Sequence, residues 1–364
     1  MTAQLQPIVF DDLSGWDDDD HRTAFDAFCV SARKMVEAPY KTRGLGVDAE
    51  ALAEIASKAL QHPDIGSREA KTFFETHFRP HRLAPGPIRD TGFLTGYWEP
   101  EMEASRTQSA AFPVPLYSKP PELVEISDAE RPATMDSSFR YARKTDEGFE
   151  EFFTRGDIQN GAIDGRDLEL VWMSNKEDAF FVHIQGSARL VLEDGGTMRV
   201  TYAAKSGHPY TSLGKVLIER LGVTQAEMTS DVLREWMEAH PDELDDFLAL
   251  NDSYIFFKEV TGLDPDAGPV AAAKVSLVPG RSLAVDRTLH TFGSPVWIAT
   301  HQPLPGDDKP FRRLMIAHDT GSAIVNAARG DIFMGTGDEA GLIAGKIQHS
   351  ADMAVLVPRG DVLS

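Results

Sequence analysis

The segment that decides the fold reads Arg281-Ser-Leu-Ala-Val-Asp286, then Leu314-Met-Ile-Ala-His-Asp319-Thr-Gly, then Gly330-Asp331-Ile-Phe-Met-Gly335. Each aspartate follows or adjoins a short apolar run of strand length, so we expect each to stand at a strand end, where barrel folds present catalytic groups. If the three carboxylates converge, mutual repulsion and partial burial raise the pKa of at least one. Such a carboxylic acid can stay protonated near neutral pH. Taken singly, Asp-Thr-Gly and Gly-Asp are also ordinary turn signals.

The composition of the 364-residue chain narrows the choice of function. Its length suits two domains, and 42% hydrophobic residues can fill sizeable cores. The chain has 57 Asp and Glu against 36 Lys and Arg, a formal net charge of -21. This charge argues against nucleic acid and anionic membrane surfaces as partners, but it is compatible with a polysaccharide.

Residues that commonly bind metals or cofactors are sparse or scattered. Cys29 is the single cysteine, so no intrachain disulfide or thiolate cluster is expected, and we interpret it as a small core residue rather than a reactive thiol. The 11 histidines show no paired ligand spacing. The sequence also lacks a nucleophile elbow and a phosphate loop. We therefore expect no metal and no cofactor.

Apolar runs that could enter a membrane are short in this sequence. None approaches the roughly 18 residues of a transmembrane helix. The first residues, Met1-Thr-Ala-Gln-Leu-Gln-Pro7, lack the basic and apolar regions of a signal peptide. We expect either a cytoplasmic protein or a mature form from which an export segment has been removed.

Periodicity predicts a helical beginning and a strand-rich middle. Apolar residues recur at helical spacing over His21–Val36, Asp48–Leu60 and Ser67–Phe78. Strands are expected over Glu169–Met173, Ala179–Leu192, Thr197–Ala203 and Asp252–Lys258. Helices are expected over Ser212–Leu221, from a cap at Thr229 or Ser230 to His240, and from Pro241 onwards. A linker is expected over Gly262–Gly268.

The strand expected over Ala179–Leu192 carries several candidate binding residues. Gln185, Ser187 and Arg189 alternate along it, so all three could point into a cleft. Gly186 inside it indicates a bulge or a close approach by another backbone or a ligand. Glu193-Asp-Gly-Gly196 predicts a hairpin to the next strand. We interpret His183 as a satisfied core histidine.

A second aromatic and acidic stretch, Gly96-Tyr-Trp-Glu-Pro100, reads as a strand that ends in a turn. Its aromatic residues, Tyr97 and Trp98, can serve either as core or as platforms for sugar rings. The residues alone leave both interpretations open.

Together these motifs resemble the membrane-bound lytic murein transglycosylases of type A. Asp286, Asp319 and Asp331 fall on the three aspartate positions of that family, and Gly335-Thr-Gly-Asp-Glu-Ala340 follows as it does there. The family also has counterparts of Gly96-Tyr-Trp-Glu-Pro100, His183-Ile-Gln-Gly-Ser-Ala-Arg189 and Gly207-His-Pro-Tyr-Thr-Ser212. The resemblance covers about residues 90–345.

The resemblance implies a mainly β fold with a helical N-terminal region and two β-barrel-like domains. A double-psi β-barrel catalytic domain would comprise residues 1–105 together with 263–364, and residues 106–262 would form an inserted β-barrel that binds substrate. In that family the groove between the two domains holds the glycan strand. The implied substrate-binding residues are Tyr97, Glu99, Gln185, Gly186, Ser187, Arg189, Tyr210, Ser212, Thr320 and Gly321.

The implied activity is non-hydrolytic cleavage of the β-1,4 bond between N-acetylmuramic acid and N-acetylglucosamine in peptidoglycan, which leaves 1,6-anhydromuramic acid ends. The resemblance makes Asp331 the general acid and base, with Asp319 and Asp286 as neighbours that raise its pKa or stabilise positive charge on the sugar. The implied partner is the peptidoglycan glycan strand. We expect a monomer in the periplasm or on the periplasmic side of the outer membrane, any membrane anchor lying in a segment absent from this sequence.

The sequence departs from the family pattern after Asp319. The family usually has Asp-Thr-Gly-Gly-Ala-Ile-Lys-Gly at this point. In this chain Ser322 replaces the second glycine, and Val325-Asn326 replaces Lys-Gly. These departures keep a non-catalytic glycan-binding protein as an alternative. An aspartic protease is a second alternative, because Asp-Thr-Gly occurs at Asp90 as well as at Asp319 and two such loops can share one proton. It is disfavoured because residues 86–89, rather than an apolar strand, precede Asp90.

Overall fold

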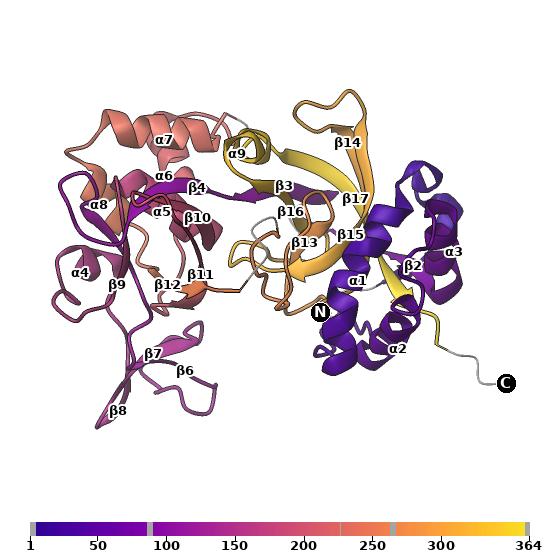
Figure 1. The fold of residues 1–364 in the computed structure, drawn as a ribbon, viewed down its shortest axis with the longest axis horizontal. Helices are drawn as coiled ribbons and strands as arrows, with labels where there is room; N and C mark the ends of the chain where they lie inside the picture. The colour runs from indigo at the N-terminus through magenta and orange to yellow at the C-terminus, as the bar shows by residue number, and fades with distance from the viewer. Residues whose placement is uncertain (1–4, 86–89, 226, 263–266, 361–364) are drawn as a thin grey trace. The chain divides into compact units, whose positions relative to one another are not determined.

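The computed structural model describes residues 5–85, 90–225, 227–262 and 267–360 (Figure 1). The chain divides into two compact units. The first comprises Met1–Trp98, Asp266–Gly335 and Glu339–Ser364, and the second comprises Glu99–Pro265 and Thr336–Asp338. The first unit is thus assembled from segments far apart in sequence. No helix among the described residues is long and apolar enough to cross a membrane.

The first unit is built on an eight-stranded sheet with the order β1-β2-β17-β14-β15-β13-β16-β3. Strand β17 also pairs with β3, so the strands from β17 to β3 in this order close into a ring. The strands are β1 Gln6–Pro7, β2 Phe78–Arg82, β3 Gly92–Glu99, β13 Ser282–Val285, β14 Pro295–Pro303, β15 Pro310–Asp319, β16 Arg329–Thr336 and β17 Gln348–Pro358. Within the ring, β13 runs parallel to β15 and antiparallel to β16.

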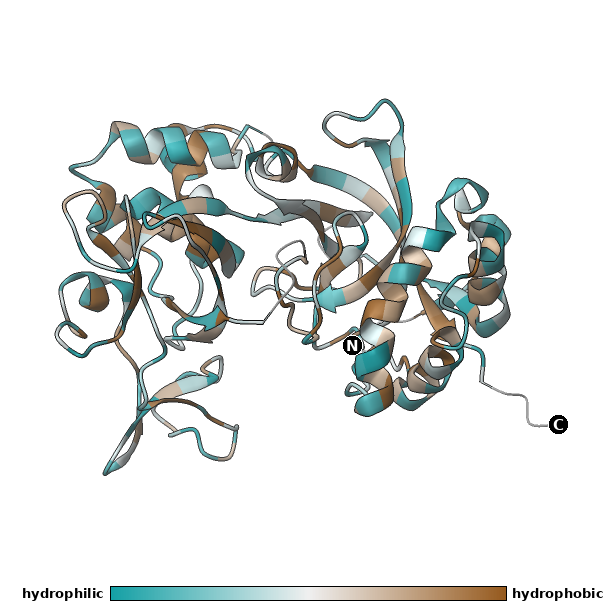
Figure 2. Cartoon of the chain, in the orientation of Figure 1, coloured by the Kyte–Doolittle hydropathy of each residue, from teal (hydrophilic) through white to brown (hydrophobic). Residues whose placement is uncertain are grey.

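Three N-terminal helices pack beside this ring: α1 His21–Glu37, α2 Ala49–Ala59 and α3 Ser67–His77. Asp20 and Asp48 start the first two, because their carboxylates accept hydrogen bonds from backbone N–H groups of the first turn. Each helix alternates hydrophilic and hydrophobic residues along its length (Figure 2), as a helix with one buried face does. The ring of Phe25 in α1 packs edge-on against Phe73 in α3, with 5.1 Å between centroids. A further helix, α9, spans Asp338–Ala344.

A buried ion pair fixes the segment before α1 to the strands. The Arg281 guanidinium donates to the Asp19 carboxylate at 2.8 and 2.9 Å, and both side chains are more than nine-tenths buried. Asp19 also accepts from the backbone N–H of Leu314, and Arg281 donates to the Leu314 carbonyl. The pair therefore joins the N-terminal segment to β13 and β15 at once.

The second unit contains a six-stranded sheet with the order β12-β11-β10-β4-β9-β5 and a three-stranded sheet with the order β6-β7-β8. The edges of the larger sheet meet at a bridge between Ser118 and Phe257, so it curls like a barrel. The strands are β4 Glu101–Ser105, β5 Val114–Tyr117, β6 Leu123–Glu125, β7 Tyr141–Thr145, β8 Gly148–Glu150, β9 Glu169–Met173, β10 Ser187–Leu192, β11 Thr197–Lys205 and β12 Ile255–Val260. The helices are α4 Arg155–Gln159, α5 Lys176–Gln185, α6 Leu213–Leu221, α7 Ser230–Ala239 and α8 Leu244–Ala249.

The strand expected over Ala179–Leu192 is wrong in its first half, because residues 176–185 form helix α5. The Asn175 side chain accepts from the N–H of Asp178 and caps the helix, and Gly186 ends it at φ 74. A short apolar run is compatible with either a buried helix or a strand, and here the caps decide. Gly186 is therefore a helix end rather than a bulge, and Gln185 does not continue the strand face of Ser187 and Arg189.

Other local predictions in this unit are confirmed. Strands β10 and β11 form the hairpin expected around residues 193–196. The Thr229 hydroxyl accepts from the N–H of Val232 and caps α7. His183 is a buried core histidine, with its ring 4.5 Å from that of Tyr254. The linker expected over Gly262–Gly268 lies partly outside the described residues.

Removing the carboxylate of the buried ion pair tests how much it stabilises the first unit. We expect Asp19→Ala to lower the free energy of unfolding by about 3–5 kcal/mol, because it leaves the Arg281 charge buried without its partner. Urea denaturation followed by circular dichroism measures the loss. The exposed neighbour Asp18 supplies the control, since Asp18→Ala removes a carboxylate that is solvated. Equal stability of the two variants would contradict a stabilising pair.

Candidate active site

The three aspartates occupy different positions on their strands. Asp319 is the last residue of β15, and Asp286 directly follows the last residue of β13. Asp331 lies inside β16, near its beginning. The expectation of a strand end is thus confirmed for the first two and wrong for Asp331.

Strand register brings Asp319 and Asp331 onto one face. Ala284 of β13 stands opposite Asp319 on one side and opposite Asp331 on the other. Residues directly opposite each other on neighbouring strands project to the same face of a sheet. Two strand spacings amount to roughly 10 Å between the backbones, and the small methyl group of Ala284 lies between them.

Asp331 is held by a hydroxyl from the neighbouring strand β3. The Thr95 hydroxyl donates to Oδ1 of Asp331 at 2.5 Å, and Nη2 of Arg329 donates to the Thr95 oxygen at 2.7 Å. Burial raises the pKa of Asp331, and the negative charge of Asp319 raises it further. The positive charge of Arg329 and the Thr95 hydrogen bond lower it, but burial dominates.

Asp319 receives more hydrogen bonds than Asp331. The Tyr97 hydroxyl donates to Oδ2 at 3.0 Å, and the N–H of Ala272 donates to Oδ1 at 3.0 Å. Burial raises the pKa of Asp319, while these two donors and the N–H of Thr320 oppose the rise. Burial and the two nearby carboxylates hold the pKa of Tyr97 well above its usual value, so its phenol stays a donor.

Asp286 has a different set of hydrogen-bond partners. Its Oδ1 accepts from the N–H and hydroxyl of Thr288, at 2.9 and 2.6 Å, and its Oδ2 accepts from the N–H of Asn326 at 2.9 Å. Asp286 thus holds the backbone of the loop that follows Asp319, whereas strand register and mutual repulsion link Asp319 with Asp331.

This loop carries Thr320 and Gly321, two of the implied binding residues. The Thr320 hydroxyl donates to the carbonyl of Val285 at 2.8 Å, which ties the loop to the end of β13. Gly321 and Ser322 are exposed. Asn326, which replaces a glycine of the family pattern, has φ 96, in the left-handed region that asparagine tolerates better than most residues. Asparagine is therefore compatible with the turn that this chain makes here.

Glu99, in the second unit, is a fully buried carboxylate with a cationic partner. Nε and Nη2 of Arg199 lie 2.9 and 3.1 Å from its two oxygens, and the Thr336 hydroxyl donates to Oε2 at 2.8 Å. Burial raises the pKa of Glu99, and Arg199 opposes the rise. Arg199 stands opposite Arg189 across the hairpin, and Arg189 pairs with Glu101. These contacts occupy both candidate polar side chains, Glu99 and Arg189.

The remaining implied binding residues have mixed positions within the second unit. The carbonyl of Gly186 accepts from the N–H of Tyr202 at 2.7 Å, and Ser187 opposes Thr201 in the hairpin. Ser212 caps α6 by accepting from the N–H of Lys215. Tyr210 is 40% exposed and can offer its ring to a ligand.

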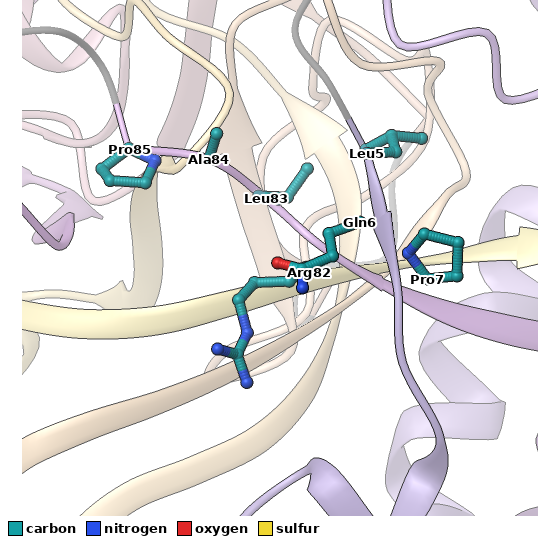
Figure 3. Close-up of a pocket in the computed structure, with 7 residues that line it drawn as sticks. All are labelled: Leu5, Gln6, Pro7, Arg82, Leu83, Ala84 and Pro85. Atoms are coloured by element: carbon teal, nitrogen blue, oxygen red, sulfur yellow. The ribbon is translucent and has the colours of Figure 1, made fainter.

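A separate hollow on the first unit carries none of these groups. It has a volume of about 600 Å³ and is lined by Leu5, Gln6, Pro7, Arg82, Leu83, Ala84 and Pro85 (Figure 3). It offers no carboxylic acid for proton transfer. Within the described ranges, no three His, Cys, Asp or Glu side chains gather in a way that could hold a metal ion.

Comparison with known proteins finds two family models that match this chain. Residues 93–258 match the MltA specific insert domain, and residues 281–357 match the 3D domain. A crystal structure of a membrane-bound lytic murein transglycosylase from Agrobacterium tumefaciens is 42% identical, covers 98% of both chains and superimposes with a TM-score of 0.89. The chain belongs to the membrane-bound lytic murein transglycosylase A family.

Two further comparisons, both with MltA of Escherichia coli, extend this result. Membrane-bound lytic murein transglycosylase A of Escherichia coli K12 is 31% identical over 270 residues, which are 72% of this chain and 65% of that protein. The chain thus spans just under two thirds of that relative. A crystal structure of E. coli MltA with bound chitohexaose is 25% identical, has a TM-score of 0.67, and the match covers 98% of this chain and 92% of that one.

The structure adds three residues to the candidate site that the sequence motifs do not indicate. Thr95 and Arg329 hold Asp331, and Arg199 compensates Glu99. Thr95 stands two residues before Tyr97 on one strand, so strand alternation was a usable signal for it. Arg199 could have been found from its place opposite Arg189 in the predicted hairpin.

A titration tests whether the Thr95 hydroxyl stabilises the charged form of Asp331. We expect Thr95→Val to raise the pKa of Asp331, because the carboxylate loses a donor that the neutral acid needs less. Carbon NMR of labelled aspartate carboxyl groups measures the shift, with Asp331→Asn used to assign the signal. Thr95→Ser keeps the hydroxyl and should leave the pKa near that of the parent protein. The same shift in both variants would contradict the role.

Proposed function

We propose that the protein is a peptidoglycan lytic transglycosylase in which Asp331 is the catalytic acid and base. The observation that carries the proposal is the pair of buried aspartates, Asp319 and Asp331, whose pKa values are both raised on one face of the first unit. Membership of the family supports the reaction and the substrate. The chitohexaose bound to the E. coli relative supports a glycan strand as the ligand.

The unequal hydrogen bonding of the two aspartates assigns their roles. Asp319 accepts from the N–H groups of Ala272 and Thr320 and from Tyr97, all of which favour its ionised form. Burial raises the pKa of Asp331 and the negative charge of Asp319 adds to the rise, so we assign the proton to Asp331. Because their environments differ, Asp331 serves as the proton donor and Asp319 as the anion.

The reaction needs one acid because the substrate supplies its own nucleophile. Asp331 donates its proton to the glycosidic oxygen that leaves, and the 6-hydroxyl of muramic acid attacks the anomeric carbon. The Asp331 carboxylate then removes the proton of that hydroxyl, which restores the acid. A hydrolase instead places two carboxylates around a water molecule. The product end is 1,6-anhydromuramic acid.

The neighbours of Asp331 orient it and prepare the site for positive charge. Thr95 holds Oδ1, which leaves Oδ2 to carry the transferred proton. The Asp319 anion, held by Tyr97, stabilises positive charge that develops on the sugar ring. Asp286 acts indirectly by holding the loop that carries Thr320 and Gly321.

We assign the remaining expectations in the same way. The ring of strands in the first unit is the double-psi barrel, and the second unit is the inserted barrel. The implied binding residues of the second unit contact the glycan, and the enzyme works as a monomer in the periplasm or at the periplasmic side of the outer membrane. An aspartic protease is less well supported, because Asp90 is exposed and the carboxylate near Asp319 is Asp331.

Removing the acid tests the central assignment. We expect Asp331→Asn to lower turnover of purified peptidoglycan by a factor of at least about 10²–10⁴, because one group makes both proton transfers. Pull-down of the variant with insoluble peptidoglycan should show unchanged binding. Asp308→Asn, at an exposed position of the same unit, is the matched control. Parent-level turnover of Asp331→Asn would move the role to another residue.

Product masses test the reaction type. We expect fragments that lack one water relative to hydrolysis products, because the 6-hydroxyl rather than solvent ends the reaction. Mass spectrometry of digests of purified glycan strands gives the answer directly. Products with free reducing ends would show hydrolysis and overturn the mechanism, although the assignment of the substrate would stand. Strands that bind but stay intact would favour the non-catalytic alternative.

A further inference from the structure

A cavity of about 450 Å³ lies within the second unit, lined by residues of β5, β9, α4, α5 and α8 and by Tyr254. Its walls include the aromatic side chains of Tyr117, Trp172, Phe180 and Tyr254. None of the residues assigned above to catalysis or glycan binding lines it. Its chemistry is therefore open to a separate interpretation.

Arg155 is the unusual group in this cavity. Its side chain belongs to a residue only 4% exposed, and Nε and Nη2 donate to the carbonyls of Asn251 and Ser253 at 3.1 and 2.8 Å. Among the described residues it has no ion pair with a carboxylate, and Nη1 has no hydrogen-bond acceptor. A buried charge without a counter-charge is costly, so a bound anion would relieve it.

The groups around Arg155 partly stabilise its positive charge but supply no negative charge to neutralise it. The rings of Phe180 and Tyr254 lie 5.3 and 5.1 Å from the guanidinium carbon, a cation–π arrangement. Nη2 lies 3.3 Å from Nδ1 of His183, whose pKa is held well below its usual value by burial and by Arg155 itself. The histidine is thus neutral and supplies no negative charge. Burial lowers the pKa of Arg155 to about 10, which leaves it charged at neutral pH.

Two carboxylates on the same cavity wall have the opposite character. Asp164 is exposed and Glu169 is half-buried, and neither forms an ion pair with a described residue. Asp164 accepts a hydrogen bond from the Tyr117 hydroxyl at 3.3 Å. The third acid of the wall, Asp245, is already neutralised by Lys176 at 2.6 Å. The cavity therefore offers a buried cation and, nearer to solvent, two unpaired anions.

We propose that this cavity binds a small ligand whose carboxylate and ammonium group are separated by several atoms, as they are in a short peptide or an ω-amino acid. The carboxylate meets the free edge of the Arg155 guanidinium, and the ammonium group meets Asp164 and Glu169. The aromatic walls cover the apolar part between them. A ligand with only a negative charge would be repelled by the two acids, and a ligand with only a positive charge would be repelled by Arg155. The cavity therefore favours a ligand that carries both charges.

Such a ligand can be free, or it can be part of the peptide chains that peptidoglycan carries. The second source rests on the proposed function, whereas the first does not. Binding to the cavity requires no cleavage of the glycan. A failure of the catalytic assignment is therefore distinguishable from a failure of this one.

Matched probes test the charge selection. Trp172 lines the cavity, so its fluorescence should report titrations with 6-aminohexanoate, hexanoate and hexylamine, and isothermal titration calorimetry should give the affinities. We expect 6-aminohexanoate to bind at least roughly 10-fold more tightly than either probe with one charge, since hydrogen bonds to charged groups each contribute that much or more. Equal affinity of the three probes, or no binding of any, would overturn the proposal.

Two variants locate the contacts. Glu169→Gln, at a half-buried position, should weaken 6-aminohexanoate by roughly 10-fold, because the ammonium group loses its partner. The same change should strengthen hexanoate, because one of the two charges that repel an anion is removed. Arg155→Lys keeps the charge but loses the planar fork, and it should weaken both probes. Circular dichroism checks that each variant is folded, and the result for Glu169→Gln decides the matter if Arg155→Lys does not fold. An unchanged affinity of Glu169→Gln for 6-aminohexanoate would refute the ammonium contact.

The source of the ligand is tested with peptides released from peptidoglycan by an amidase. Binding of these peptides to Asp331→Asn at least as tight as that of 6-aminohexanoate would identify the polymer's own peptide chains. Weaker binding than 6-aminohexanoate would exclude these chains and favour a free ligand of the same charge pattern, whatever the outcome of the cleavage assays.

Discussion

The position of β13 between β15 and β16 is the constraint on which the candidate site depends. This strand is short and fully buried, and its register with both neighbours places Asp319 and Asp331 opposite Ala284. A slip of one residue on either side would send one carboxylate to the other face of the sheet. Gly330 permits the close fit, because a Cβ atom there would lie 2.9 Å from a methyl group of Leu283. The Ser282 hydroxyl further pins β13 to the buried His318 of β15, 2.8 Å away.

Buried charge is handled in two ways in this protein. Asp19 with Arg281, and Glu99 with Arg199, are carboxylates matched by guanidinium groups, and both pairs hold segments together. Asp319 is instead held by N–H groups and a phenol, and Asp331 by a hydroxyl. Neutral donors fix a carboxylate in place while leaving its protonation adjustable. A close ion pair favours the ionised form and so works against holding the proton that an acid must give.

The sequence was most informative where a local rule acts. Helix α1 begins at His21, where the apolar periodicity predicts its start, and the hairpin between β10 and β11 forms at its glycine turn. The three aspartates could be found because each lies in a short motif. The strand assignment failed over α5, since an apolar run of that length does not distinguish helix from strand and the capping role of Asn175 was missed. Contacts such as Thr95 with Asp331 join residues 236 positions apart, and no local pattern encodes such a pairing.

The closure of the β ring by β17 has a bearing on how the chain is made in the cell. This strand pairs with β14, β2 and β3, and it follows every other strand of the ring in sequence, so the ring cannot close until β17 has left the ribosome. The second unit is almost continuous in sequence and emerges earlier, which allows it to fold while the first unit still waits for its final strand. Strand β3 is synthesised long before its partners β16 and β17. During translation its unpaired edges are therefore the part of the nascent chain most in need of protection from aggregation.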